Sequence, residues 1–163
     1  MDSDAADIAY FADRALDGMI AILTDLGDEL GNQAPDLPGA NSCFAILTHC
    51  LGVMNYWGGY VVAGREIQRD RDAEFKATGH VQDLILRVLA ARAQLHHDLA
   101  LAILSDPVAN MPPEPYDSPR PELLQGTVLL HVLEELAQHH GQMEITRDVL
   151  LSDKRSSTVS AEQ

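Results

Sequence analysis

The segment between His131 and Gln142 combines residue types whose spacing could bind a metal ion. Within it, Glu135 and His139 lie four residues apart in a stretch that is predicted to be helical. Successive helical residues are rotated by about 100°, so side chains four apart differ by only about 40° and share a face. A carboxylate and an imidazole on one face supply two ligands of a metal site, and the third must come from elsewhere in the chain.

His49 is the best candidate for the third ligand, because it occupies the centre of the inward side of another predicted helix. Ile46 and Val53 lie within about 60° of it on the helical wheel. An inward histidine is more commonly a hydrogen-bonded core residue, and a Glu–His pair at this spacing is more commonly a surface ion pair. Neither feature alone establishes a metal site. His131, four residues before Glu135, could replace that ligand or support it through a hydrogen bond.

The composition favours one soluble domain. The chain has 163 residues, of which 46% are hydrophobic, enough to bury a sizeable core. The formal net charge is −14, from 25 acidic and 11 basic residues, which argues against nucleic acid or an anionic membrane surface as a partner. The acidic N-terminus lacks the basic and apolar regions of a signal peptide, and no apolar run is long enough to span a bilayer. We therefore expect a cytoplasmic location.

Apolar residues recur at helical spacing in four stretches, and no stretch alternates as a half-buried β-strand would. The sequence predicts helices over about residues 4–30, 41–63, 80–104, and from 121 or 127 to 151. Gly31 ends the first of these helices, and Asn41 and Ser42 are good N-cap residues for the second.

Two long connections complete the predicted architecture, an all-α four-helix bundle with long crossover loops. Residues 64–79 are highly charged, and residues 105–121 contain six prolines, which exclude a regular helix there. We expect residues 1–151 to form a single bundle and the polar residues 152–163 to form a disordered tail. Bundles build metal sites between facing helices, which suits ligands on the second and fourth helices.

The two cysteines, Cys43 and Cys50, are predicted to be buried free thiols. They lie seven residues apart on one predicted helix, so their Cα atoms would be about 10 Å apart, too far for a disulfide. Cys50 follows His49 in the sequence, but adjacent helical residues point about 100° apart and do not face each other. This geometry disfavours a nucleophilic role for Cys50.

Two motifs resemble the DinB-like superfamily. They are L-T-H-C-L-G around His49 and E-L-A-Q-H-H-G-Q, which begins at Glu135. The resemblance, over about residues 4–151, implies a four-helix bundle with one metal-ligand histidine in the second helix and two more ligands at i and i+4 in the fourth, just before Gly-Gln. Many members have histidine at both of those positions. This chain has Glu135 at the first, so the implied triad is His49, Glu135 and His139, similar to the actinobacterial branch of mycothiol S-transferases and mycothiol-dependent maleylpyruvate isomerase.

The resemblance implies a metal-dependent thiol S-transferase that conjugates mycothiol to electrophiles, a detoxification activity. Two imidazoles and one carboxylate leave a divalent ion such as zinc with an open coordination position, where an incoming thiol would lose its proton and become the nucleophile. Imidazole ligands suit other divalent metals as well. Two alternatives stay open: a hydrolase in which the metal activates water, and a non-enzymatic, metal-stabilised stress-response bundle. A homodimer is a further open alternative.

Mycothiol is a cysteine derivative on a sugar–inositol unit, so its recognition needs polar groups and aromatic surfaces near the metal. The end of the second helix offers aromatic residues, of which the first is also a candidate for a direct catalytic role: Tyr56, Trp57 and Tyr60. Their alternative role is core packing. The following connection offers cations that could bind a carboxylate or hydroxyls: Arg65, Arg69 and Arg71. Their alternative role is a solvated loop in which they pair with Asp70, Asp72 and Glu74.

Overall fold

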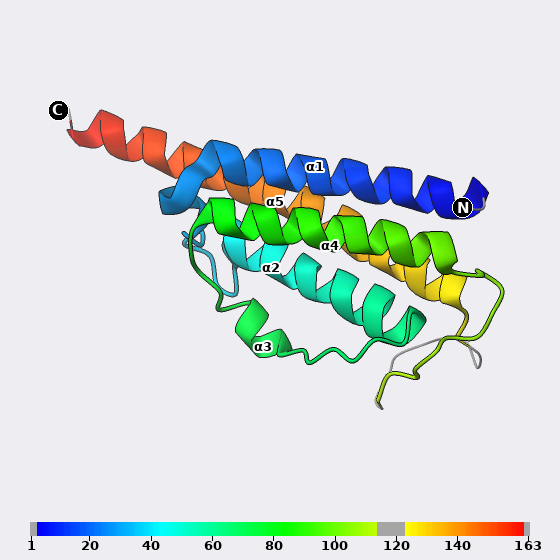
Figure 1. Ribbon diagram of the computed structural model, residues 1–163. Coiled ribbons are helices and arrows are strands. Elements are labelled where there is room, and N and C mark those ends of the chain that lie inside the picture. The colour runs from blue at the N-terminus through cyan, green and yellow to red at the C-terminus, as the bar shows by residue number, and fades with distance from the viewer. Residues whose placement is uncertain (1–2, 114–122, 162–163) are drawn as a thin grey trace.

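The chain folds as an all-helical bundle, as the periodicity predicts (Figure 1). A computed structural model describes residues 3–113 and 123–161. Within these residues there is no β-strand, and the only bridge of that type is an isolated one between Pro107 and Leu124. The elements in chain order are α1 (Ser3–Gly31), α2 (Cys43–Val53), the π-helix η1 (Met54–Val62), α3 (Arg71–Glu74), α4 (Val81–Leu101) and α5 (Gln125–Ala161).

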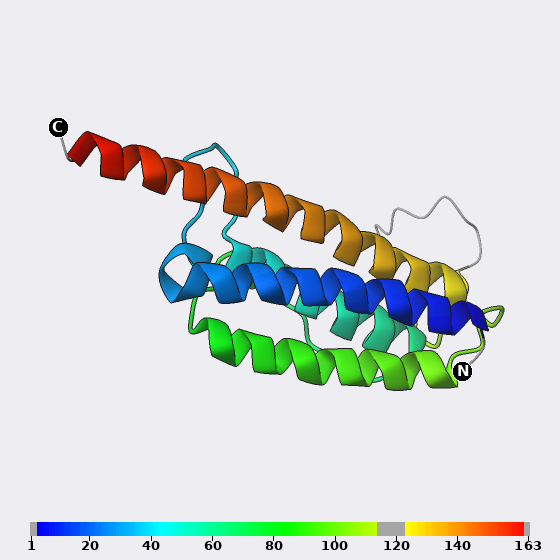
Figure 2. The same cartoon turned by 90° about the horizontal axis from the view of Figure 1, so that it is seen from above.

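The long helices form two parallel pairs, and the two pairs run in opposite directions. In Figures 1 and 2, α1 and α5 run side by side in the same direction, while α2 with η1 and α4 run the other way. Because α2 and α4 are parallel, the chain must return along the length of the bundle between them. The charged connection after η1 makes this return and carries α3 past the outer side of α2. This crossover brings distant residues next to the second helix.

The core is a continuous apolar cluster to which all the long helices contribute. Its fully buried side chains include Leu16 and Met19 from α1, Ile46 from α2, and Leu136 and Met143 from α5. Burying one such side chain contributes roughly 1.5–3 kcal/mol, so the bundle has ample hydrophobic stabilisation apart from any bound group.

Both cysteines are free and buried, as predicted. Burial raises the pKa of the Cys43 thiol to about 11, and burial also raises the pKa of the Cys50 thiol. Neither side chain is therefore a ready thiolate, since the thiolate is the nucleophilic form.

The second predicted helix has the expected extent but not a uniform geometry. Ser42 is its N-cap and accepts a hydrogen bond from the Ala45 amide, but the last nine residues form the π-helix η1. Gly58 and Gly59 lie in this segment, and their missing Cβ atoms leave room for close neighbours. A Cβ on Gly59 would stand 2.5 Å from Nη2 of Arg65. A π-helix has a wider turn than an α-helix, and the 3.6-residue period in the sequence does not reveal this change.

Two other segments differ from the sequence-based expectation. The charged connection contains the short helix α3, which Asp70 caps by accepting from the Ala73 amide. The polar C-terminal residues, expected to be disordered from 152 onward, continue α5 as helix to Ala161 and project beyond the bundle in Figure 2. No glycine or proline follows Gly141, so no residue of the usual helix-ending types stops α5.

The fourth predicted helix, expected to start at residue 121 or 127, starts at Gln125 in the structure. Pro121 lies outside the described residues. Within the described part of the chain, none of the helices has the length and apolar character that crossing a membrane requires.

Candidate metal centre

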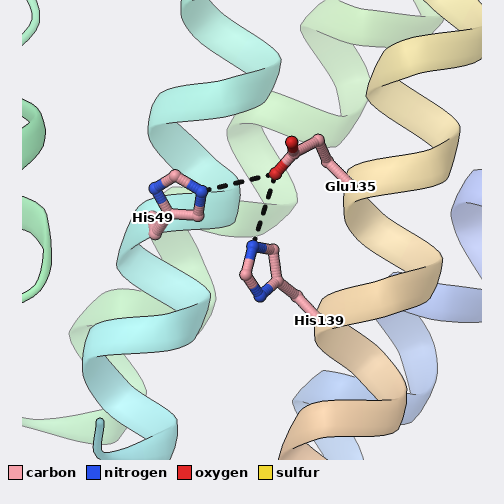
Figure 3. A group of neighbouring side chains, drawn as sticks. All are labelled: His49, Glu135 and His139. Atoms are coloured by element: carbon pink, nitrogen blue, oxygen red, sulfur yellow. Dashed lines mark ion pairs between the residues drawn. The ribbon is translucent and has the colours of Figure 1, made fainter. Parts of the chain in front are cut away.

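Three side chains predicted to be ligands converge between α2 and α5 (Figure 3). His49 projects from the middle of α2, and Glu135 and His139 project from successive turns of α5. Oε2 of Glu135 lies 3.5 Å from Nε2 of His49 and 3.3 Å from Nε2 of His139. All three ligand atoms lie within 4.8 Å of one another, so the predicted convergence is present.

These separations are compatible with one small cation. Ligand atoms about 2.0–2.1 Å from a tetrahedral zinc ion are separated from each other by roughly 3.3–3.4 Å. The two Glu135 distances, 3.3 and 3.5 Å, already fall close to this value. The His49 side chain is only 4% exposed, while those of His139 and Glu135 are 19% and 26% exposed. The site is therefore anchored in the core on one side and accessible on the other.

The outer nitrogen of each imidazole has an acceptor that selects its tautomer. Nδ1 of His49 lies 2.9 Å from Oε2 of Glu74, and Nδ1 of His139 lies 2.8 Å from Oε1 of Gln142. When each Nδ1 donates a proton to these acceptors, each Nε2 presents a lone pair toward Glu135. The inner side of the site then presents three lone-pair atoms, two imidazole nitrogens and one carboxylate oxygen. A divalent cation needs ligand atoms of this kind.

The electrostatics of the site keep Glu135 charged. The hydrogen bond with His139, followed by the effect of the nearby His49 ring, holds the pKa of Glu135 well below its usual range, against the opposing effect of partial burial. The same hydrogen bond with Glu135 raises the pKa of His139. Without a metal, this shift favours a proton on His139, and a metal ion would take the place of that proton.

His131 lies beside the triad and touches the other oxygen of its carboxylate. Its Nε2 is 3.7 Å from Oε1 of Glu135, whereas the three converging ligands meet around Oε2. The ring of Trp57 packs edge-on against His131, with centroids 5.0 Å apart. A separation of 3.7 Å is too long for a hydrogen bond, so the supporting role considered for His131 stays a prediction. The contact with Trp57 links the aromatic residues of η1 to the site.

The candidate thiol-binding residues lie on one side of this centre, on η1 and the crossover. Tyr56 and Tyr60 are stacked, with ring centroids 5.4 Å apart, and Trp57 meets Tyr56 edge-on. All three are partly buried and pack against the core. Burial raises the pKa of the Tyr56 phenol, so this hydroxyl stays protonated at neutral pH.

The arginines have protein partners. Arg69 forms two hydrogen bonds with the carboxylate of Glu74 and lies over the Tyr56 ring. Arg69 therefore pairs with an acid of its own connection, which was the alternative to binding a ligand. Arg65 forms an ion pair with the buried Asp98 of α4, and the Arg65 side chain is nevertheless 33% exposed. Arg71 lies over the ring of Phe75.

Glu74 is a residue of the site that sequence reasoning did not single out, because it was placed among the charges of a solvated loop. It is 8% exposed and contacts His49 directly. Phe75, the next residue, stacks on the His49 ring at a centroid distance of 4.5 Å. The available signal was the aromatic Phe75 next to Glu74 in an otherwise mostly charged segment, because an aromatic residue there indicates that this turn faces the core.

The fold and site define a class of helical-bundle proteins with a His-Glu-His centre between the second and last long helices. The family model for mycothiol S-transferase matches residues 7–151, and the chain belongs to that family. The resemblance to its DinB-like fold is thereby confirmed. Membership indicates a transferase that acts with a thiol substrate.

The comparison with solved structures gives the same fold. A crystal structure of a conserved protein from Enterococcus faecalis matches with a TM-score of 0.71 and 15% sequence identity, over 93% of this chain and 99% of that one. At this identity the match supports the fold alone. The comparison with curated proteins returned no significant match.

Proposed function

We propose that this chain is a metal-dependent S-transferase that joins mycothiol to a small electrophile, with His49, Glu135 and His139 holding a divalent cation, zinc in the first instance. The observation that carries the proposal is the convergence of two imidazole nitrogens and one carboxylate oxygen within 4.8 Å. Three protein ligands are typical of catalytic zinc sites, whereas structural sites commonly have four. A cation bound there would act as a Lewis acid that lowers the pKa of an incoming thiol.

The ligand charges suit an anionic nucleophile. Glu135 is ionised, and the two imidazoles are neutral when they bind through Nε2, so the three ligands together contribute one negative charge. A divalent site with one carboxylate keeps a net positive charge and attracts a thiolate, while a site with three carboxylates would repel it.

The thiol must come from a co-substrate. Both cysteines of the chain are buried, and burial raises the pKa of each. In the proposed reaction the co-substrate sulfur loses its proton to solvent and forms a bond to the electrophilic carbon. A leaving group departs with the bonding pair, or the pair moves onto the acceptor when the reaction is an addition.

We assign the binding of the thiol's polar body to the surface formed by η1 and the start of the crossover. Trp57 and Tyr60 supply aromatic faces, and the exposed part of Arg65 supplies hydrogen-bond donors for hydroxyls. Tyr56 stays protonated and is suited to donate a hydrogen bond to the reacting sulfur or to the leaving group. Arg69 packs against this surface through the contact of its guanidinium with the Tyr56 ring.

The decisive experiment compares thiol donors on one general electrophile. Purified protein is assayed with mycothiol, bacillithiol and glutathione in parallel, before and after chelation and after zinc is restored. We expect transfer with mycothiol that is lost on chelation and regained with zinc. Turnover that is equal without any thiol would favour the hydrolase, and zinc binding with no turnover of any electrophile would favour the non-enzymatic bundle.

A further inference from the structure

We propose that Glu74 is a positioning residue for His49, delivered by the crossover and held in place by Arg69. The inference rests on the metal site proposed above and is independent of the thiol chemistry. Glu74 itself is not one of the three converging ligands. It acts on the outer nitrogen of His49, on the side of the ring that faces away from Glu135.

The hydrogen bonds of Glu74 leave neither carboxylate oxygen without a donor. Oε1 accepts from Nε of Arg69 at 2.8 Å, and Oε2 accepts from Nη2 of Arg69 at 2.9 Å and from Nδ1 of His49 at 2.9 Å. Arg69 cannot be deprotonated in a protein and is only a donor, so its two bonds fix the orientation of the carboxylate. The remaining bond to His49 must then be donated by Nδ1, which leaves the Nε2 lone pair facing the site.

Nη2 of Arg69 also lies 3.4 Å from Nδ1 of His49. Both atoms would carry protons in this arrangement, so we interpret that approach as a consequence of their shared acceptor, Oε2 of Glu74, and not as a hydrogen bond. The shorter distances to the carboxylate, each 2.9 Å, support this interpretation.

The local sequence makes room for Glu74 against α2. Gly52 lies one turn after His49 on α2, and a Cβ there would overlap Oε1 of Glu74. Phe75 covers the face of the His49 ring, so the ring is held by a stacked aromatic as well as by the hydrogen bond. The crossover residues Glu74 and Phe75, together with the space left by Gly52 on α2, thus fix the orientation of one imidazole.

The stability of the bundle does not require this charged contact. A buried ion pair is often no more stabilising than apolar residues of the same volume, because both charges lose their hydration. The buried carboxylate is better explained by its effect on His49. Carboxylate partners of metal-bound histidines select the tautomer and increase ligand basicity, and their removal commonly reduces metal affinity 10- to 100-fold.

The test measures the His49 tautomer and zinc affinity in three variants of the full chain. Glu74→Ala removes the acceptor, and Glu74→Gln keeps the size but removes the charge. Asp98→Asn is the matched control, because Asp98 is also buried and paired with an arginine of the same connection but is not paired with a ligand of the triad. Nitrogen NMR of the metal-free protein, in mildly alkaline buffer, reports which ring nitrogen of His49 carries the proton.

In the unsubstituted protein and in Asp98→Asn, we expect the proton on Nδ1 and equal zinc affinity. In Glu74→Ala, we expect a mixture of tautomers and an affinity that is about 10- to 100-fold weaker, with Glu74→Gln in between. An unchanged tautomer together with unchanged affinity in both Glu74 variants would overturn the inference. If Glu74→Ala does not fold, Glu74→Gln decides. If the unsubstituted protein binds no zinc, the proposed metal site fails, while the tautomer in the metal-free protein still decides the role of Glu74.

Discussion

The chemistry of the site at the scale of single residues follows from the atoms that face Glu135. Nε2 of His49 and Nε2 of His139 approach the same carboxylate oxygen, so a cation bound there would contact all three atoms. In the metal-free protein the hydrogen bond with Glu135 raises the pKa of His139, which favours a protonated imidazole there. A divalent cation would replace that proton, with three ligands in place of one hydrogen bond.

Replacing His49 should remove the metal without unfolding the protein. We expect His49→Ala to reduce bound zinc from about one ion per chain to near zero, because the three-ligand site would keep only Glu135 and His139. The helices should persist, because the apolar cluster supplies the core. Metal analysis and far-ultraviolet circular dichroism measure the two effects. His97→Ala, at an exposed position of α4, is the control and should keep full occupancy. Full zinc occupancy in His49→Ala would transfer the ligand role to His131.

Replacing Glu135 by glutamine should act on both the metal and the neighbouring histidine. We expect zinc affinity to fall by more than about tenfold, since a charged ligand is lost. In the metal-free variant, the pKa of His139 should fall back toward its ordinary value of about 6.5, because the partner that raises it has lost its charge. Titration of His139 by proton NMR checks this shift. A pKa that stays as high in Glu135→Gln as in the unsubstituted protein would show that Glu135 is not its cause.

The sequence predicts the three converging residues because two of them share a helical face and the third is central on another inward face. Glu74 could not be predicted in the same way. It lies 25 residues from His49, and the two meet only because the crossover passes along α2 and Gly52 leaves space for a carboxylate. Spacing reports contacts within one helix, whereas this contact depends on the path of an irregular segment.

The limits of helical periodicity become clear at the scale of the elements. The periodicity places α1, α2, α4 and α5 correctly, since their apolar stripes are long. It does not reveal η1, because the change from i, i+4 to i, i+5 backbone hydrogen bonds has no marker in the residue types. Ser42 correctly marks the start of its helix, because capping depends on local residue type. Gly31 is the last residue of α1, but the helical geometry already breaks at Gly27, which has a positive φ of 63°.

Two glycines in helix interiors should respond to alanine in opposite ways. Gly141→Ala in α5 should stabilise the fold by roughly 0.4–1 kcal/mol, because nothing lies within 4 Å of the new Cβ and alanine restricts the unfolded chain. Gly52→Ala should instead displace Glu74 and weaken zinc binding, because its Cβ would overlap the carboxylate. Chemical denaturation and zinc titration of both variants provide the comparison. Equal zinc affinity in the two variants would contradict the role given to Gly52.

The contact between the end of α1 and the start of α4 should make stability depend on pH. Asp28 accepts from the Val81 amide at 2.7 Å and from Nδ1 of His80 at 2.9 Å. The hydrogen bond with Asp28 raises the pKa of His80, and the bond from His80 lowers the pKa of Asp28. The His80 contribution is therefore fully present below the unfolded pKa of about 6.5 and is lost as the pH rises through the higher folded value.

A comparison of the unsubstituted protein with His80→Gln measures this contribution. The difference between their urea midpoints should be larger at about pH 5.5 than at about pH 8.5, and small at both because the pair is exposed. His97→Gln, at an exposed position on the same helix, should give the same small difference at both values. A difference that grows with pH would reverse the assigned sign.

At the scale of the whole molecule, the bundle could be predicted from four apolar stripes and two long connections, but the course of the connections could not. The direction of α4 relative to α2 is fixed by the return of the chain along the bundle, and that return creates the contact between the crossover and the site (Figure 1). Similarly, α5 continues past the position at which polarity suggested an end, because polar residues without glycine or proline remain compatible with helix.

Because its ligands come from α2 and α5, the metal site should be coupled to the stability of the entire fold. A cation that binds the folded chain alone stabilises it by RT ln(1 + [L]/Kd), about 2.7 kcal/mol at a free concentration of 100 times Kd. For a chain of this length, 1 kcal/mol shifts Tm by roughly 2–4 °C, so we expect zinc to raise Tm by about 5–10 °C under those conditions. Calorimetry with and without a chelator measures the shift. In His49→Ala the zinc-induced shift should vanish, while the Tm of the metal-free variant should itself be lower than that of the metal-free unsubstituted protein, because a buried side chain is lost. An equal zinc-induced shift in both proteins would show that the stabilising ion binds somewhere other than between α2 and α5.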